Sequence, residues 1–84
     1  MSLYISIDPG NKKCGLLLAD IKSGNVIEAG ISSLSKFLDL ITLWNEKYQI
    51  SKIIIGDGTN SKFIENKLKK KNVSNINYVN EKGS

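Results

Sequence analysis

The sequence has no histidine, one cysteine and one proline in its 84 residues. A single cysteine excludes a disulfide within the chain, and with no histidine a structural zinc site is not expected. No apolar run approaches the roughly 18 residues that a membrane span needs. The N-terminus lacks a basic region followed by a long apolar stretch, so no secretory signal is expected. These absences favour a single cytoplasmic domain over residues 1–84, without a membrane partner.

Arginine is also absent, so all of the positive side chains are lysines. Twelve lysines stand against eight acidic residues, which gives a net charge of +4. This balance permits binding to a polyanion such as nucleic acid, but does not require it. An AT-rich genome would also explain many Lys, Asn and Ile residues without arginine. Charge alone therefore does not identify a partner.

Isoleucine is abundant, and most of the twelve isoleucines lie in short apolar runs that predict a core rich in sheet. The runs 3–8, 14–20 and 26–31 are separated by turn-forming residues and predict a three-stranded meander. Pro9 and Gly10 suit the central pair of a type II turn, in which Gly10 would have a positive φ.

The period of the pattern changes after this meander. Residues 33–49 place one set of apolar side chains on a single helix face, namely Phe37, Leu38, Ile41, Trp44 and Tyr48. Ser33 or Ser35 is expected to cap this helix. Trp44 lies on the apolar stripe, so it is predicted to be a core residue.

The rest of the chain predicts a buried strand over 52–58, a helix over 59–71 capped within 59–61, and a strand over 76–81. The order is β-β-β-α-β-α-β. A strand–helix–strand unit on one sheet is parallel, through a right-handed crossover. The expected fold is therefore α/β, with a mixed five-stranded sheet and helices packed on it. Ligands of such sheets bind at the carboxyl ends of the strands.

Acidic residues follow three of the apolar runs: Asp8, Asp57 and Glu81. If the first, fourth and fifth strands are parallel neighbours, these acids share one edge of the sheet. Carboxylates that lie close together repel, and a divalent cation removes that cost. Mg²⁺ prefers oxygen ligands, and Mg²⁺ or Mn²⁺ can support the cleavage of phosphodiesters. The pattern therefore predicts a metal-binding, catalytic edge formed by these three residues.

Each of these acids also has an ordinary structural interpretation. Asp8 can accept hydrogen bonds within a turn, Asp57 can be a turn residue or a helix cap, and Glu81 can be simply solvated. Asp20 belongs to the opposite edge and is expected to be a turn residue. Cys14 begins an apolar strand, and nothing marks it as reactive.

Four lysines are candidates for contacts with nucleic-acid phosphates: Lys13, Lys67, Lys70 and Lys71. Lys13 follows the first turn, close in sequence to Asp8. The other three lie at the end of the second predicted helix, where positive charge also suits the helix dipole. Solvated surface lysines are the alternative interpretation for all four.

Together, these segments resemble a known family. "IDPGNKKCGLLLAD" resembles the opening of the YqgF-type, Holliday-junction-resolvase-like proteins of the ribonuclease-H superfamily. The matching residues are Asp8, Pro9, Gly10, Lys12 or Lys13, Gly15 and Asp20. "KIIIGDGTNS" resembles the fourth strand and its loop, and "INYVNEKGS" resembles the fifth strand. The resemblance covers nearly the whole chain in order.

The resemblance implies a metal-dependent nuclease acting on structured DNA or RNA, as in junction resolution or the maturation of ribosomal RNA ends. It implies that Asp8 and Glu81 bind the metal. Asp57 matches the position at which ribonucleases H carry an acid.

The sequence departs from the family at two places. The acidic–arginine pair of the family is replaced by Asn80, Glu81 and Lys82. The family also continues into a helical region that supplies a third aspartate, whereas this sequence stops at Ser84. We therefore expect a fold without its C-terminal helical part. Three explanations stay open: the chain is a fragment, a partner supplies the helix, or the protein has lost catalysis. We also expect the chain to form a homodimer or to pair with a missing segment.

Two other functions fit the sequence. Actin- and hexokinase-like ATPases share the fold and open with a similar hairpin, which holds phosphates through backbone N–H groups. That interpretation makes the chain a nucleotide-phosphate-binding module. A non-catalytic domain that binds nucleic acid or acts as a scaffold is the other alternative.

Overall fold

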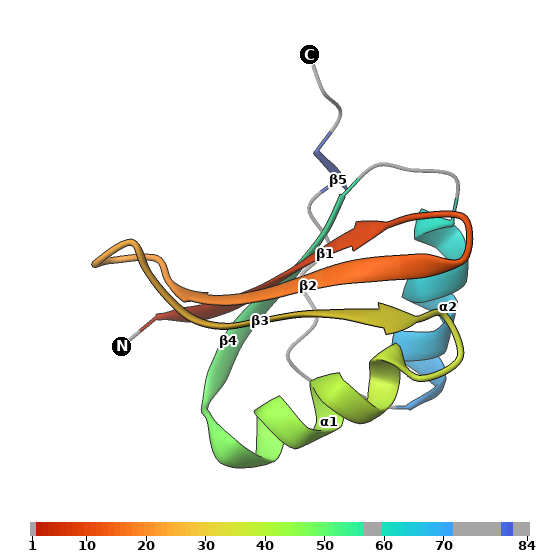
Figure 1. Ribbon diagram of the computed structural model, residues 1–84. Helices are drawn as coiled ribbons and strands as arrows, with labels where there is room; N and C mark the ends of the chain where they lie inside the picture. The colour runs from red at the N-terminus through yellow and green to blue at the C-terminus, as the bar shows by residue number, and fades with distance from the viewer. Residues whose placement is uncertain (1, 57–59, 72–79, 82–84) are drawn as a thin grey trace.

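The computed structural model describes residues 2–56, 60–71 and 80–81. The elements follow the predicted order (Figure 1). Their bounds are β1 Leu3–Pro9, β2 Lys13–Asp20, β3 Asn25–Ser33, α1 Phe37–Lys47, β4 Ile50–Gly56, α2 Ser61–Lys70 and β5 Asn80–Glu81.

The five strands form one mixed sheet in the order β3-β2-β1-β4-β5. β1 pairs antiparallel with β2, and β2 pairs antiparallel with β3, which gives the predicted meander. On its other side β1 pairs parallel with β4, and β4 pairs parallel with β5. The carboxyl ends of β1, β4 and β5 therefore lie at one edge of the sheet, as the sequence predicted.

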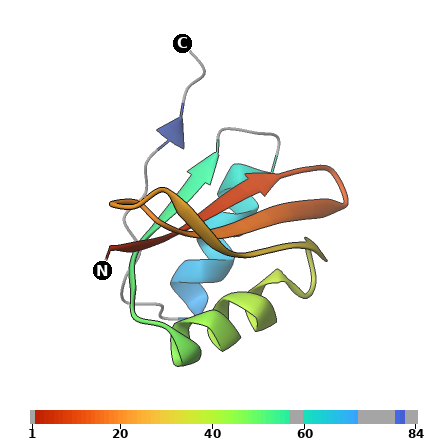
Figure 2. The ribbon, with the colours of Figure 1, turned by 60° about the vertical axis from the view of Figure 1, so that its left-hand side comes forward.

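Both helices cover the same face of the sheet, and the other face is bare of helices in the described part of the chain (Figures 1 and 2). Alternation along β1 explains this arrangement: Leu3, Ile5 and Ile7 are buried, whereas the residues between them are only partly covered. In a strand, successive side chains point to opposite faces, so one apolar row per strand suffices to hold the helices.

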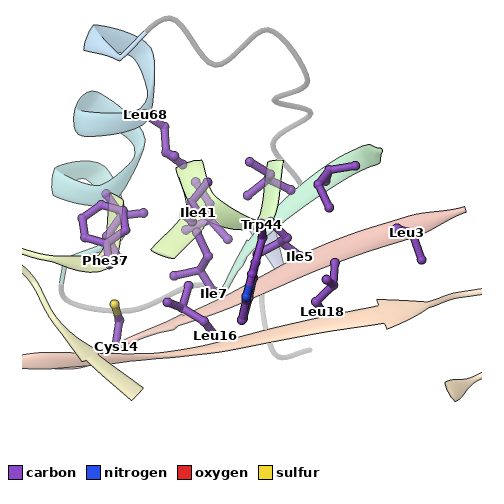
Figure 3. Close-up of a cluster of buried hydrophobic side chains, with 14 residues drawn as sticks. Leu3, Ile5, Ile7, Cys14, Leu16, Leu18, Phe37, Ile41, Trp44 and Leu68 are labelled. Carbon is purple, nitrogen blue, oxygen red and sulfur yellow. The ribbon is translucent and has the colours of Figure 1, made fainter. Parts of the chain in front are cut away.

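One hydrophobic core lies between the sheet and the two helices (Figure 3). Phe37, Ile41 and Trp44 enter it from α1, and Ile64 and Leu68 enter it from α2. The strands supply Leu3, Ile5, Ile7, Cys14, Leu16, Leu18, Ile50, Ile53 and Ile55. Trp44 is 3% exposed, which confirms its prediction as a core residue. Cys14 is buried in this core, and its burial raises the pKa of the thiol.

The first helix is shorter than predicted because β3 continues to Ser33, where it pairs with Lys13 of β2. The expected serine cap is wrong: the N-cap is Lys36, without a side-chain hydrogen bond. The hydroxyls of Ser33 and Ser35 instead lie 3.1 Å from each other. The ladder with β2 thus takes the residues that the sequence assigned to the helix start.

The first turn also differs from the prediction. Pro9 still belongs to β1 and pairs with Cys14, and the Gly10 amide donates to the Lys13 carbonyl at 2.9 Å. Among the described glycines, Gly24 is the one with a positive φ, 75°. Gly10 is required for space instead, because a Cβ there would lie 2.6 Å from the Lys13 carbonyl oxygen.

The second helix and the last strand lie within the predicted ranges. The N-cap of α2 is Asn60, inside the predicted cap range, but its side chain makes no capping hydrogen bond. Of the predicted strand 76–81, residues 80–81 are described and form β5, and the rest lies outside the described residues.

Neither of the helices in the described ranges has the length and apolar character that a membrane span requires.

Candidate functional site

Asp8 lies on the bare face of the sheet, one residue before the end of the central strand β1. It follows the buried Ile7 and is itself exposed. It borders an open pocket of about 750 Å³ on that face, whose lining also includes Ser6, Leu17, Ala29, Ile31 and Ile54. A carboxylate at the rim of a largely apolar hollow is thus available to a ligand.

Glycines flank Asp8 on both neighbouring strands. Gly15 of β2 is its direct partner in the antiparallel ladder. On the other side the parallel register pairs Ile7 with Ile55, so the next residues along the two strands are Asp8 and Gly56. Both glycines line the pocket. Neither contributes a side chain, so the space beside the Asp8 carboxylate is open in both directions.

Glu81 falls in the same row of the sheet as Asp8. β5 pairs with β4 so that Glu81 is the partner of Gly56. With neighbouring strands about 4.8 Å apart, the backbones at positions 8 and 81 are separated by about 10 Å, with Gly56 between them. The backbone register therefore brings two of the three predicted acids to one edge. Asp57, the third, follows Gly56 in the chain and lies outside the described residues.

The donors at this edge are oxygen atoms, as hard divalent cations require. The soft ligand of the chain, Cys14, is buried in the core on the opposite side of the sheet. In the ranges that the structure describes, no three Asp, Glu, Cys or His side chains are grouped closely enough to hold a metal ion. Oxygen donors of this kind suit a hard divalent cation such as Mg²⁺ or Mn²⁺. Asp8 is the acid of this edge whose side chain the structure describes.

The hairpin loop after Asp8 is held from two sides. The Lys12 carbonyl accepts from the Leu34 amide at 3.3 Å, just after β3. The Gly10 carbonyl accepts from Nδ2 of Asn60 at 2.6 Å, at the start of α2. Lys12 and Lys13 are exposed in and beside this loop. The predicted phosphate contact Lys13 therefore lies near Asp8. From the sequence, Asn60 was predicted only as a possible helix cap.

The other three predicted phosphate contacts lie elsewhere. Lys67, Lys70 and Lys71 are exposed at the C-terminal end of α2, whereas the N-terminal end of α2 is the one bound to the hairpin loop. The ten residues of α2 span about 15 Å. Nζ of Lys67 lies 5.5 Å from the centre of the Phe63 ring, a contact within the helix. These lysines are not brought together with Lys13.

Asp20 is a turn residue, as predicted. Its carboxylate accepts from the Lys22 amide at 3.1 Å and from the Ser23 hydroxyl at 3.1 Å. It lies at the end of β2 opposite to Gly15, so it is remote from Asp8.

The chain resembles known proteins in structure and not in sequence. No protein-family model and no curated protein sequence matches it. Solved structures do match. The Fowlpox virus resolvase, in complex with its substrate Holliday junction DNA, superposes with a TM-score of 0.59 at 19% identity, over 94% of this chain. The fold is ribonuclease-H-like.

Two structures of Aquifex aeolicus proteins are also similar. The type II variant of its Ppx/GppA phosphatase superposes with a TM-score of 0.54 at 15% identity, over 96% of this chain. Another structure of the Ppx/GppA family member gives 0.55 at 14% identity, over 98% of this chain. The chain spans 59% of the resolvase chain and 36% of each phosphatase chain. At these sequence identities the structural similarity establishes the fold alone. The activity has to be argued from the residues of the site.

Proposed function

We propose that this domain is a resolvase-like nuclease, related to the YqgF type, that hydrolyses phosphodiesters of structured nucleic acid with the help of Mg²⁺ or Mn²⁺. The observation that carries the proposal is Asp8. It is an exposed carboxylate at the carboxyl end of the central strand, flanked by two glycines and in register with Glu81. The structural similarity to a resolvase bound to Holliday junction DNA supports the choice of substrate class.

Asp8 and Glu81, with Asp57 directly after β4, are the residues that would hold the cation. A bound divalent cation supplies activation of water and stabilisation of the leaving oxygen in phosphodiester hydrolysis. The residues of the chain would position the substrate, because Gly15 and Gly56 leave room beside Asp8 for a phosphate group. Lys12 and Lys13 add positive charge on the same hairpin, which attracts the backbone of the substrate.

The runner-up is a nucleotide-phosphate-binding module, which the similarity to the Ppx/GppA structures favours. In that function the first hairpin would hold phosphates through its backbone N–H groups. The Gly10 amide, however, already donates to the Lys13 carbonyl at 2.9 Å. The hairpin therefore lacks one of the free donors that a phosphate cradle would need, and we rank this function second.

A cleavage assay tests the proposal. Labelled four-way junction DNA, nicked duplex DNA and structured RNA are incubated with the protein in Mn²⁺, and cleavage is followed on denaturing gels. We expect cleavage of at least one branched substrate, abolished by EDTA and reduced at least about 100-fold by Asp8→Asn, since one missing metal ligand removes a large part of the catalytic stabilisation.

The matched control is Asp39→Asn, which removes the same charge from an exposed carboxylate in the first turn of α1, on the other side of the sheet. It should leave cleavage unchanged. Equal loss of cleavage in the two variants would contradict a catalytic role for Asp8. Binding of the junction that persists in EDTA, with no cleavage in Mn²⁺, would instead support the non-catalytic function.

A further inference from the structure

The side chain of Asn60 joins the start of α2 to the hairpin loop, across fifty residues of sequence. The ribbon of Figure 1 shows the start of α2 next to the hairpin that connects β1 and β2. Its Nδ2 donates to the Gly10 carbonyl at 2.6 Å and lies 3.4 Å from the Asn11 carbonyl oxygen. The first is a short hydrogen bond, and the second is at the long limit. One amide group thus contacts two successive carbonyls of the loop that begins two residues after Asp8.

The loop has a second anchor on its other side. The Leu34 amide donates to the Lys12 carbonyl at 3.3 Å, and the loop is closed internally by the Gly10 amide and the Lys13 carbonyl. The carbonyls of Gly10, Asn11 and Lys12 are therefore all directed at partners on other elements. This leaves the side chains of Lys12 and Lys13 exposed while their backbone is fixed from both sides.

Asn60 contacts the hairpin loop in place of the capping hydrogen bond that an N-cap asparagine usually makes. Asparagine at an N-cap normally accepts a hydrogen bond from a backbone amide in the first turn of its own helix. Here the N-cap residue Asn60 makes no such bond, and the first turn of α2 contains no acidic residue to complement the helix dipole. The side-chain amide of Asn60 is therefore used in a contact with the hairpin loop and not within its own helix.

We propose that Asn60 is a positioning residue that holds the hairpin loop so that Lys12 and Lys13 contact the phosphate backbone of the nucleic acid beside Asp8. This inference rests on the proposed function, because it assumes that nucleic acid is the substrate. It also places the expected contact with nucleic acid on the hairpin loop and not on the C-terminal end of α2. The loop lysines lie beside the site, whereas Lys67, Lys70 and Lys71 lie at the far end of α2.

The variant Asn60→Ser tests the proposal without changing the net charge. Serine is about as good an N-cap as asparagine, so the helix start is preserved, but the amide that reaches the loop is gone. Asn66→Ser is the matched control, since Asn66 is exposed on the same helix. Both are made in the native chain and in a chain with Lys12→Ala and Lys13→Ala.

Affinity for a fluorescently labelled four-way DNA junction is measured by anisotropy in EDTA, so that no cleavage occurs. In the native chain we expect Asn60→Ser to weaken binding about threefold to tenfold, and Asn66→Ser to have no effect. In the chain that lacks the two lysines, Asn60→Ser should cause no further loss, because residues that act through one another are not additive. The same loss in both backgrounds would overturn the proposal.

Amide hydrogen exchange gives a second readout that needs no nucleic acid. The amides of Gly10 and Leu34 should exchange faster in Asn60→Ser than in Asn66→Ser, because both amides donate hydrogen bonds to backbone carbonyls of the hairpin, at Lys13 and Lys12. Unchanged exchange would overturn the positioning role by itself. If the native protein binds neither branched nor duplex nucleic acid, the proposed function fails, and the role of Asn60 toward phosphates falls with it.

Discussion

At the scale of single residues, the two glycines beside Asp8 have different surroundings. A Cβ at Gly15 would lie 3.8 Å from the Asp8 Cβ, an ordinary contact. A Cβ at Gly56 would lie 3.3 Å from the Ile7 carbonyl oxygen and 3.7 Å from Pro9 Cδ, which is tighter and involves backbone. The same substitution should therefore have different effects at the two positions.

We expect Gly56→Ala to lower the free energy of unfolding by about 1–3 kcal/mol, as overpacking against a rigid neighbour does. Gly15→Ala should stay within about 0.5 kcal/mol of the native protein, because alanine costs less than glycine in a strand and its Cβ would make only an ordinary contact with the Asp8 Cβ. Urea denaturation followed by circular dichroism measures both. A loss at Gly15 as large as that at Gly56 would contradict the described packing.

The position of Asp8 could be predicted from sequence because it depends on local signals: an apolar strand, an acid and a turn. The role of Gly56 could not. That glycine matters because the parallel pairing of β1 and β4 places it beside Asp8, and the pairing register is not written in either strand alone. The contact of Asn60 with Gly10 was missed for the same reason, since it joins residues fifty positions apart.

At the scale of elements, the two helices are held by a few fully buried side chains. Ile41 of α1 is 0% exposed, whereas Leu43 of the same helix is 55% exposed. We expect Ile41→Ala to lower the free energy of unfolding by about 2–5 kcal/mol, from lost burial and the cavity left behind. Leu43→Ala should change it by less than about 0.5 kcal/mol.

Thermal or urea unfolding of the two variants, side by side, checks this prediction. Both remove the same kind of aliphatic side chain from one helix, so helix propensity changes little between them. Similar destabilisation by the two substitutions would mean that α1 does not pack on the sheet through the face that contains Ile41.

Element order and sheet topology could be predicted because apolar periodicity separates strands from helices. Element ends could not. Ser33 is a good cap by composition, but the ladder offers backbone pairing with Lys13, and β3 extends to take it. Gly10 looked like a residue of positive φ, yet its actual requirement is the missing Cβ close to the Lys13 carbonyl. In both cases tertiary pairing overrides a local preference.

At the scale of the whole molecule, the sheet is covered by helices on one face only in the described part of the chain (Figure 2). The other face carries apolar side chains with substantial exposure, among them Ile31 at 78% and Leu17 at 37%. Exposed apolar surface of this kind favours association. We predict that the chain pairs through the β2 and β3 part of this face, with a second copy of itself or with a further segment, so that the β4 side of Asp8 stays open to substrate.

Sedimentation velocity over a range of protein concentrations tests the pairing. We expect concentration-dependent dimers, and we expect Ile31→Ser to weaken dimerisation at least about tenfold, because a large exposed side chain would be lost from the interface. Ile21→Ser is the control: Ile21 is 52% exposed but follows β2 at the opposite end from the Asp8 site. A stable monomer at all concentrations would contradict self-pairing.

The proposed function requires that the sheet edge formed by β1, β4 and β5 binds a divalent cation through Asp8. Mn²⁺ titration by isothermal calorimetry tests it most directly, on the native protein, Asp8→Asn and Asp39→Asn. Calorimetry is preferable to tryptophan fluorescence, because Trp44 of α1 is buried in the core on the opposite face of the sheet from Asp8. We expect saturable binding in the native protein and in Asp39→Asn, and at least a tenfold loss of affinity in Asp8→Asn. Equal binding in all three proteins, or no binding in any of them, would contradict the account.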